Sequence, residues 1–322
     1  MGLPKVTVRH HAALSGEQDE KLVTAAIGPT GDAIALWAPA NDLPALRSVT
    51  RPPGGTAFPD PGSPYPVSTR VTTYSPKPMT STRIPGLGLA NVSVQPLPDG
   101  RVLIVGARAA WRTGGPDRNA VVYDDAGRPE AEETFGDGIN HVHTTESGRI
   151  WVGYFDEGVF GNYGWDEDAA PPPVGVSGLV RFSPDLEPEW HFPRGHPWGP
   201  IYDCYALNVD GETAWTCYYD GFSLVRVHDS AVDGWFNDDV NGASALAVGG
   251  DRVALFGGYS PRRDRLVVGR LESGRLWVEG EFRVVLPDGG PLPSNRTVVG
   301  RGADLHLLSG HQWFRLGLDD LA

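Results

Sequence analysis

The feature that most constrains the fold is a hairpin pattern that returns along the whole chain. Residues 139–154 (INHVHTTESGRIWVGY) read as an extended run, a Ser147-Gly148 turn and a second extended run, which is typical of a β-hairpin. Residues 89–106 repeat this pattern around Asp99-Gly100, and residues 202–219 repeat it around Asp210-Gly211. Weaker copies occupy residues 22–39, 243–259 and 297–311. These copies predict an all-β repeat architecture in a single domain, 1–322.

A second kind of hairpin alternates with the first. Each copy opens with two β-forming residues, passes a polar turn and ends in Phe; the copies are residues 120–135, 179–192, 224–236 and 266–282. One inner and one outer hairpin make a four-stranded sheet, and such sheets arranged in a ring form a β-propeller. Blade starts are expected near residues 21, 88, 139, 201, 243 and 297, which gives six blades.

The first and last repeats are the least regular. Blade one is expected from Lys21 to about Tyr74, with the Pro/Gly-rich residues 52–66 as a rim loop. Because this blade is poorly marked, seven blades are the alternative. Residues 297–318 supply only three strands, so the extended residues 4–14 are predicted to add the fourth and close the ring.

Composition narrows the class of partner. The 42 Gly and 29 Pro fit a loop-rich chain, while 40% hydrophobic residues and 10 Trp fit a packed interior. A net charge of -13 disfavours nucleic acid and membrane surfaces as partners of this acidic protein. The N-terminus lacks a signal-peptide pattern and no apolar run is long enough to span a bilayer, so we expect a cytoplasmic protein.

The two cysteines lie in one predicted hairpin. Reflection about the Asp210-Gly211 turn places Cys204 opposite Cys217 on the same face. A reducing cytoplasm favours two packed thiols over a disulfide.

Two phrases resemble a known group. Residues 140–153 (NHVHTTESGRIWVG) and 202–221 (YDCYALNVDGETAWTCYYDG) are similar to inner hairpins of the six-bladed gluconolactonase and senescence-marker group. They are equally similar to hairpins of NHL-type and two-component-sensor propellers. The resemblance implies a fold, because propellers host hydrolases, lyases, isomerases and binding proteins alike.

Polar side chains recur at the starts of the inner strands, where a propeller's functional groups gather. Aligning the hairpins puts Asn140 and Asp203 at one level, with Asn91 and Asn241 within about one residue. Their oxygens would suit calcium. The lactonase resemblance implies one divalent metal held by a Glu, two Asn and an Asp, with Glu20 as a fourth ligand here, although the chain order departs from that family. The alternative is that these residues cap strand ends.

Histidines offer a second kind of chemistry. His141 and His143 point to one face of a strand, and with His311 they could form a nitrogen-rich metal site. One of them could instead act as a general base beside Asp203. The alternative is that they pack between blades.

Aromatic and acidic residues cluster in two long loops, residues 154–178 and 191–200, that are expected on one rim. The aromatic set is Tyr154, Phe155, Phe160, Tyr163, Trp165, His196 and Trp198, with Tyr218 nearby, and the acidic set is Asp156, Glu157, Asp166, Glu167 and Asp168. Such a wall would suit a sugar, an amine or another polar ligand. The alternative is that the aromatic residues seal the loops onto the sheets.

Arginines follow the second strands of other repeats. The set is Arg108, Trp111 and Arg112 after one strand, Tyr259, Arg262 and Arg263 after another, and Arg296 before the last repeat. These could hold a carboxylate or phosphate, or be solvated charges. Motifs of serine hydrolases and zinc proteases are absent from the sequence.

Two functions remain open at this stage. The first is a scaffold that binds a small polar molecule or a partner's segment at the rim of blades three and four. The second is a calcium-dependent hydrolase or lactonase acting at Asn140 and Asp203. Whether the protein is an enzyme is left open.

Overall fold

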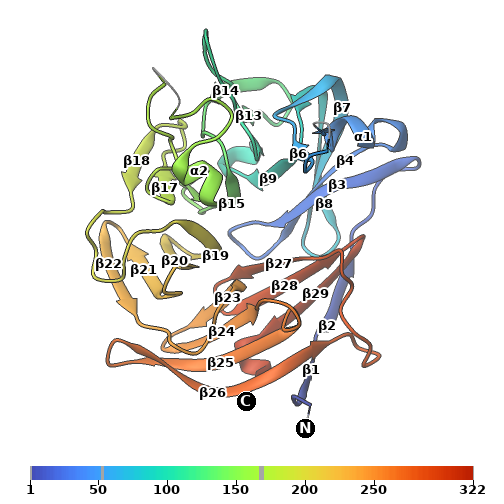
Figure 1. Ribbon diagram of the computed structural model, residues 1–322. Helices are drawn as coiled ribbons and strands as arrows, with labels where there is room; N and C mark the ends of the chain where they lie inside the picture. Colours follow the sequence, from blue (N-terminus) through green and yellow to red (C-terminus); the bar gives the residue numbers. More distant parts are fainter. Residues whose placement is uncertain (1, 52–53, 167–169, 322) are drawn as a thin grey trace. The chain divides into compact units, whose positions relative to one another are not determined.

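The computed structural model describes residues 2–51, 54–166 and 170–321, and these divide into two compact units. One unit contains residues 14–191, and the other combines residues 1–13 with residues 192–322. Within these described residues, helix is confined to α1 (Leu43–Leu46), α2 (Asp156–Phe160) and the 3-10 turns η1 (Ala40–Asp42), η2 (Pro98–Gly100) and η3 (Leu318–Leu321) (Figure 1). None of the described helices has the length and apolar character needed to cross a membrane.

Three four-stranded antiparallel sheets make up the unit of residues 14–191. The first contains β3 (Glu20–Ile27), β4 (Ala33–Pro39), β7 (Gly62–Tyr74) and β8 (Pro78–Leu89); the second β9 (Val92–Pro96), β10 (Val102–Gly106), β13 (Ala120–Tyr123) and β14 (Pro129–Glu133); the third β15 (Ile139–Thr144), β16 (Ile150–Tyr154), β17 (Leu179–Phe182) and β18 (Pro188–His191). Two small ladders, β5 (Val49–Thr50) with β6 (Phe58–Pro59) and β11 (Trp111–Arg112) with β12 (Gly115–Pro116), lie in the loops.

The other unit contains two larger sheets. The eight-stranded sheet has the order β2 (Arg9–Ala13), β29 (Gln312–Gly317), β28 (Asp304–Ser309), β27 (Thr297–Arg301), β19 (Asp203–Asp210), β20 (Thr213–Tyr219), β21 (Leu224–His228) and β22 (Ala231–Trp235). The five-stranded sheet has the order β1 (Lys5–Thr7), β26 (Arg275–Val285), β25 (Arg265–Glu272), β24 (Arg252–Gly257) and β23 (Ala243–Gly249). The chain is therefore mostly β, as the sequence predicts.

The inner hairpins form where the repeated pattern places them. All six predicted copies are paired strands, and the Asp99-Gly100 turn is confirmed because both residues have positive φ, 63° and 74°. Positive φ at both central residues gives a twist that matches the flanking strands. The four outer hairpins are also paired as expected.

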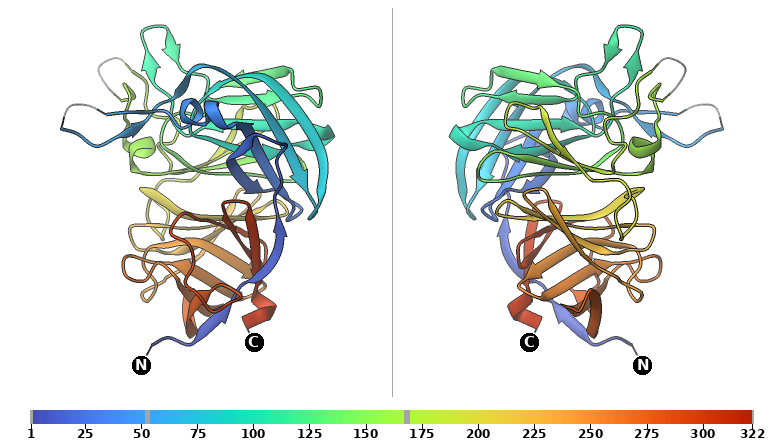
Figure 2. Two further views of the ribbon diagram at one scale, coloured as in Figure 1. Left: turned by 90° about the vertical axis from the view of Figure 1, so that its right-hand side faces the viewer. Right: turned by 90° about the vertical axis from the view of Figure 1, so that its left-hand side faces the viewer.

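The first repeat differs from the prediction because it is longer. Its outer pair, β7 and β8, extends to Leu89 rather than ending near Tyr74, and appears as the long cyan hairpin in Figure 2. The end of the predicted 52–66 loop is thus part of β7, from Gly62 on. The pairing is irregular between Gly62 and Val67, which accommodates prolines there. Pro52 and Pro53 lie outside the described residues.

The N-terminal segment adds a strand to each sheet of its unit. As predicted, β2 pairs antiparallel with β29, so that Arg9 lies opposite Arg315. The parallel pairing of β1 with β26 was not predicted. Between the two strands, Val8 is buried in the apolar core and its N–H donates to Val285 O at 3.0 Å. A single short segment thus protects the edges of two sheets.

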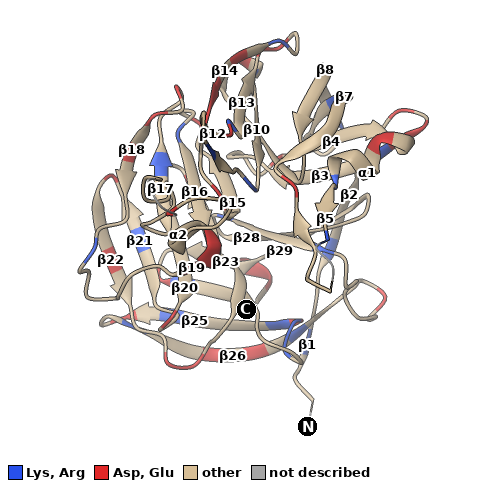
Figure 3. Ribbon diagram, turned by 45° about the horizontal axis from the view of Figure 1, so that its top comes forward, with Lys and Arg blue, Asp and Glu red and all other residues tan. Residues whose placement is uncertain are grey.

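Acidic side chains occupy exposed edge strands. In β14, Glu130 and Glu132 are exposed on the outermost strand of the second sheet, which is marked red in Figure 3. Charge on an unpaired edge disfavours pairing with another chain. Part of the net charge of -13 therefore has a structural use.

Buried Asn208 holds three inner strands together in the unit that contains the C-terminus. Its Nδ2 donates to Leu246 O of β23 at 2.8 Å and to Gly302 O at 2.9 Å, while its Oδ1 accepts from Gly302 N at 2.9 Å. Next to this contact, a Cβ on Gly300 would lie 1.8 Å from Leu246 O. Only glycine allows β23 and β27 to approach so closely.

The predicted register of the cysteine hairpin is wrong. The turn lies at Gly211-Glu212, since Asp210 pairs with Thr213, and a bulge shifts the register between Cys204 and Ala206. Cys204 therefore lies opposite Tyr218, and its Sγ is 3.3 Å from Thr216 Oγ1. Neighbouring residues of a strand point to opposite faces, so Cys217 faces away from Thr216 and from Cys204. Burial raises the pKa of both thiols to about 12, which suits structural thiols.

A buried histidine in the same unit makes stability depend on pH. His306 is 1% exposed, and its Nδ1 accepts a hydrogen bond from Trp313 Nε1 at 3.1 Å. Burial, and then the charges of Arg315, His11 and Arg301, lower the pKa of His306 to about 3. Protonation would also place a second donor against the Trp313 N–H. The folded protein therefore holds His306 neutral at pH values where the unfolded chain binds a proton.

We expect His306→Leu to flatten the loss of stability in mild acid. Because the pKa of His306 is depressed, its contribution is complete above about pH 6.5 and is lost as the pH falls toward about 3. At about 1.4 kcal/mol per pH unit, wild type should lose about 2 kcal/mol from this group between pH 6.5 and pH 5. Urea unfolding at both pH values measures the difference. His228→Leu is the control, because the His228 side chain is exposed. If the free energy of unfolding of His306→Leu depends on pH as steeply as that of wild type, His306 is not the group responsible.

Candidate functional site

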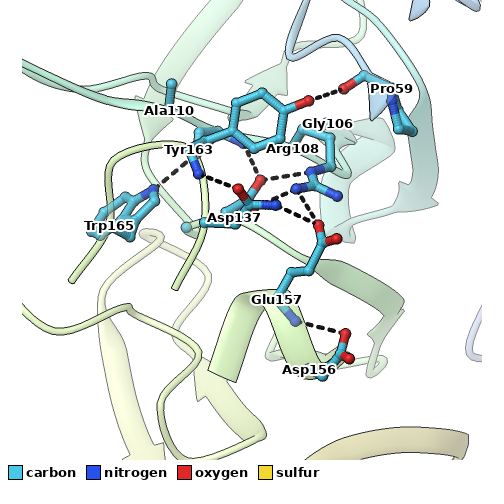
Figure 4. A network of polar contacts seen from close by, with 12 residues as sticks. Pro59, Gly106, Arg108, Ala110, Asp137, Asp156, Glu157, Tyr163 and Trp165 are labelled. Carbon is cyan, nitrogen blue, oxygen red and sulfur yellow. Dashed lines mark hydrogen bonds and ion pairs between the residues drawn. The ribbon is translucent and has the colours of Figure 1, made fainter. Parts of the chain in front are cut away.

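The predicted rim residue Arg108 is part of a buried ion cluster in the unit of residues 14–191 (Figure 4). Its Nε and Nη2 donate to the two oxygens of Asp137, each at 2.8 Å, and Nη2 lies 2.6 Å from Glu157 Oε2. Arg108 is 3% exposed and Asp137 is 1% exposed. Burial raises the pKa of Asp137, while Arg108 and the Ala109 N–H oppose this change.

Aromatic rings cover this cluster. The Tyr163 ring lies 4.5 Å and the Phe155 ring 5.4 Å from the Arg108 guanidinium carbon, and Tyr163 Oη donates to Pro59 O at 3.0 Å. Buried Trp165 donates through Nε1 to Ala109 O at 2.8 Å (Figure 4). Arg108 and Trp165 thus hold loops together through buried contacts, and a ligand contact by either residue stays a prediction. Glu167 and Asp168 of the predicted acidic set lie outside the described residues.

Two other predicted ligand residues of this unit are also structural. Tyr154 is fully buried and donates through Oη to Phe135 O at 2.7 Å. Asn91, with φ 52°, donates to Ser48 O at 2.8 Å and Asp60 O at 3.1 Å, so it caps a loop as the alternative interpretation holds. The proposed metal ligand Glu20 pairs instead with Arg70, which lowers the Glu20 pKa against the opposing effect of burial.

The histidines lie on β15 as predicted, on one face of the strand. The His141 and His143 rings are 6.5 Å apart; His143 is buried and His141 is partly buried. Exposed Asn140 occupies a bulge beside them, with Nδ2 3.3 Å from His141 Nε2. His311 belongs to the other unit, in the exposed turn between β28 and β29.

In the unit that contains the C-terminus, Tyr218 and Trp198 hold a loop against the sheet. Tyr218 is 1% exposed and donates to Trp198 O at 3.0 Å, while a Cβ on Gly234 would lie 2.4 Å from the Trp198 ring. The Trp198 ring therefore covers the bare backbone of β22. The Tyr218 side chain is thus used inside the protein, and its predicted ligand contact stays a prediction.

The unit that contains the C-terminus also has a cavity of about 480 Å³, a volume within the range of small-molecule sites. It is lined by Gly242, Ser244, Phe256, Gly257, Gly258, Arg263, Asp264, Leu292, Ser294, Arg296 and Val298. These residues come from β23, from the end of β24 and the loop after it, and from the segment that leads into β27. The apolar side chains and the serine hydroxyls line the same space.

Electrostatics distinguish the two arginines of this cavity. Arg296 Nη1 donates to Pro293 O at 2.6 Å, and Nη2 donates to Arg263 O at 2.9 Å and Asp264 Oδ1 at 2.7 Å. Arg296 thus fixes the loop that presents Arg263. Within the described residues, the exposed Arg263 guanidinium has no hydrogen bond or ion pair. The cavity consequently presents one positive charge that is available to a ligand.

A group of aromatic rings borders the cavity. Tyr259 directly follows the lining residue Gly258, and its ring lies over Gly242, where a Cβ would be 3.2 Å from the ring atoms. Tyr259 Oη lies 3.0 Å from Tyr205 Oη. The Phe222 ring is 5.5 Å from the Tyr205 ring and 5.9 Å from the Tyr219 ring. We call Tyr205, Tyr219, Phe222 and Tyr259 the aromatic cluster.

Bulges in the inner strands help to build this region. The register shifts between Cys204 and Ala206 in β19 and between Ala243 and Ala245 in β23. The extra residues are Tyr205, a member of the aromatic cluster, and Ser244, which lines the cavity. Bulges commonly redirect side chains next to sites. This signal is hard to read from sequence, because a bulge leaves the hairpin pattern almost unchanged.

The structure therefore brings some predicted residues together and leaves others apart. Arg296 and the loop arginine Arg263 line one cavity, the Tyr259 ring lies over its lining residue Gly242, and Asn241 precedes Gly242. Asp203 pairs with Tyr219 of the aromatic cluster. Sequence reasoning missed Tyr205, Tyr219, Ser244 and Ser294, although Tyr205 and Ser244 occupy equivalent positions in two inner strands.

The proposed metal ligands are divided between the units. Asn140 belongs to one unit, whereas Asp203 and Asn241 belong to the other, so a calcium site made by them stays a prediction. Among the described residues, no group of three His, Cys, Asp or Glu side chains could hold a metal ion. Metal analysis of the protein purified without chelator, with Asp203→Ala for comparison, tests that prediction directly.

Known structures that resemble the chain include several β-propellers. A β-propeller domain from Myceliophteria thermophila is 11% identical with TM-score 0.47, covering 97% of this chain and 99% of that one. A gluconolactonase from Xanthomonas campestris is 12% identical with TM-score 0.44, covering 96% and 98%. Regucalcin from Agrobacterium tumefaciens, a calcium-binding protein, is 12% identical with TM-score 0.44, covering 98% and 95%.

A longer protein is also among these structures. The chain spans 42% of the extracellular domain of a putative one-component system from B. thetaiotaomicron, at 9% identity and TM-score 0.45. Neither a protein family nor a curated protein sequence matches the chain. Gluconolactonase-like and other β-propeller chains are therefore among its structural neighbours, and no specific family is established.

Proposed function

We propose that the protein binds a small anionic molecule, with a carboxylate or phosphate group, in the cavity bordered by Arg263 and Arg296. The observation that carries this proposal is the Arg263 guanidinium, which borders a cavity of about 480 Å³ without an internal partner among the described residues. Charge-assisted hydrogen bonds from arginine suit carboxylate and phosphate oxygens. Ser244 and Ser294 add hydroxyl donors, and Phe256 and Leu292 an apolar wall.

This proposal keeps the predicted class of ligand and moves its location. Tyr154, Trp165 and Tyr218, which were predicted at the rim of the third and fourth repeats, are buried. The cavity between the fifth and sixth repeats is lined by polar groups that include Arg263, Ser244 and Ser294. A small molecule is favoured as the partner over nucleic acid, because the net charge of -13 repels a polyanion while a single local arginine can hold a small one.

We further propose that the six four-stranded groups are the blades of one closed ring, 1–322, completed by β2. Each hairpin pair is too small to bury both of its faces alone, and a ring lets every sheet pack between two others. The pairing of β2 with β29 supplies the fourth strand of the last group and supports this arrangement.

We expect Arg263→Ala to weaken the binding of inorganic phosphate by about 10- to 100-fold, since a hydrogen bond to a charged group contributes about 1.5–3 kcal/mol. Isothermal titration at low salt measures the affinity. Arg262→Ala is the matched control, because Arg262 is an exposed neighbour that does not line the cavity. Equal weakening by both variants would indicate a general charge effect. Absence of phosphate binding to wild type would overturn the proposal.

A further inference from the structure

The aromatic cluster contains exposed rings that the fold does not need for its core. Tyr219 is 47% exposed and Tyr259 is 53% exposed, whereas Phe222 beneath them is 8% exposed. The ring of Tyr219 lies roughly parallel to that of Tyr205, at 23° with centroids 6.4 Å apart. Large aromatic surface left in water is informative when it is grouped in one place.

Tyr259 is held rigidly although it is exposed. One side of its ring lies over Gly242, its hydroxyl contacts that of Tyr205, and Phe222 meets it nearly edge-on at 79°. The side chain therefore loses little further freedom when a ligand covers it. Rigid aromatic residues give contact area at a low entropic cost.

The aromatic cluster lies next to the cavity. Gly242 lines the cavity and supports the Tyr259 ring, and Gly257 and Gly258 connect the lining directly to Tyr259. An anion held at Arg263 would place whatever it is attached to beside these rings. The site therefore has an anion-binding end at Arg263 and a flat apolar end at Tyr259.

We infer that the ligand is an anion that carries a ring, with its charged group at Arg263 and the face of its ring on Tyr259. This inference rests on the proposed anion site. Sugars and aryl groups share the required chemistry, because each offers an apolar face that stacks on an aromatic side chain. Asp203 pairs with Tyr219 in the ladder of β19 and β20, and after burial and Tyr259 it contributes to the raised pKa of Tyr205.

Three probes test the inference by isothermal titration: inorganic phosphate, phenyl phosphate and glucose 6-phosphate. We expect at least one ring-bearing probe to bind about tenfold tighter than inorganic phosphate, as expected for one ring stacked on an aromatic side chain. Tyr259→Ala should remove that gain and leave phosphate binding unchanged, while Tyr259→Phe should retain it. If both ring-bearing probes bind tighter than inorganic phosphate, the protein recognises the face of the ring alone. If glucose 6-phosphate is the one probe that binds tighter, the protein also recognises its hydroxyl groups.

Trp277→Ala is the control, because Trp277 is 55% exposed in the same unit and lies outside the cluster. Equal affinity for all three probes, or a gain that survives in Tyr259→Ala, overturns the inference. Phosphate binding that still depends on Arg263 would then leave the anion site standing. If Tyr259→Ala lowers the melting temperature, Tyr259→Leu replaces it, because leucine fills the space over Gly242 without an aromatic face, and the same loss of gain is expected.

Discussion

Removal of residues 2–13 is expected to lower the free energy of unfolding by at least roughly 4 kcal/mol. The loss combines burial of Val8, worth about 1.5–3 kcal/mol, with ladder hydrogen bonds of about 1 kcal/mol each. The truncation also exposes the edges of β29 and β26, which β2 and β1 cover. Urea unfolding, followed by tryptophan fluorescence, measures the change.

A shorter truncation provides the control. Residues 2–3 are exposed and precede Pro4, whose carbonyl accepts from Arg283 N at 2.8 Å, so their removal should leave stability unchanged. Adding a synthetic peptide of residues 2–14 should raise the unfolding midpoint of the long truncation, since a strand can be supplied from outside to an exposed edge. Identical midpoints for wild type and the long truncation would show that the edge strands contribute little.

Hairpin positions could be predicted because the evidence for them is local. Turn residues such as Asp99-Gly100 and the alternation of apolar residues mark a hairpin within about 15 residues, and every predicted copy is present. The β1 pairing with β26 could not be predicted in this way, because it joins Lys5 to Arg283. Register failed at Cys204 for a related reason: one bulge changes the facing of each residue beyond it, yet leaves the sequence pattern intact.

The site was harder to predict because sequence shows which residues are polar but not which are already satisfied. Arg108 and Arg263 both follow the second strand of a repeat, and no local pattern separates them. The structure pairs Arg108 with buried Asp137, whereas Arg263 borders a cavity. Likewise, Trp165 and Tyr259 are both loop aromatics, but only Tyr259 is exposed. Burial and pairing depend on distant residues, so they emerge only from the fold.

The buried ion cluster gives the second large effect. Arg108→Leu should destabilise the protein by about 3–5 kcal/mol, because it leaves the carboxylate of Asp137 buried without its bidentate partner. Arg112→Leu is the matched control: Arg112 pairs with Asp117, but its side chain is 63% exposed, so the expected loss is about 1 kcal/mol or less. Equal effects of the two substitutions would contradict the assignment of a buried, structural ion pair.

Protonation and a double substitution separate the unpaired charge from simple loss of packing. Without Arg108, the pKa of Asp137 should rise further, and protonation removes the buried charge. A carboxyl group with a raised pKa lowers the free energy of unfolding as the pH rises through that pKa. The destabilisation caused by Arg108→Leu should therefore be smaller at pH 5.5 than at pH 7.5. Arg108→Leu combined with Asp137→Leu should be more stable than Arg108→Leu alone at pH 7.5, since neither charge remains unpaired. The double-mutant cycle consists of wild type, Arg108→Leu, Asp137→Leu and the double variant, and urea unfolding of each at both pH values measures it. A defect that is independent of pH and additive in the double variant would mean that packing, rather than charge, explains the contribution of Arg108 to stability.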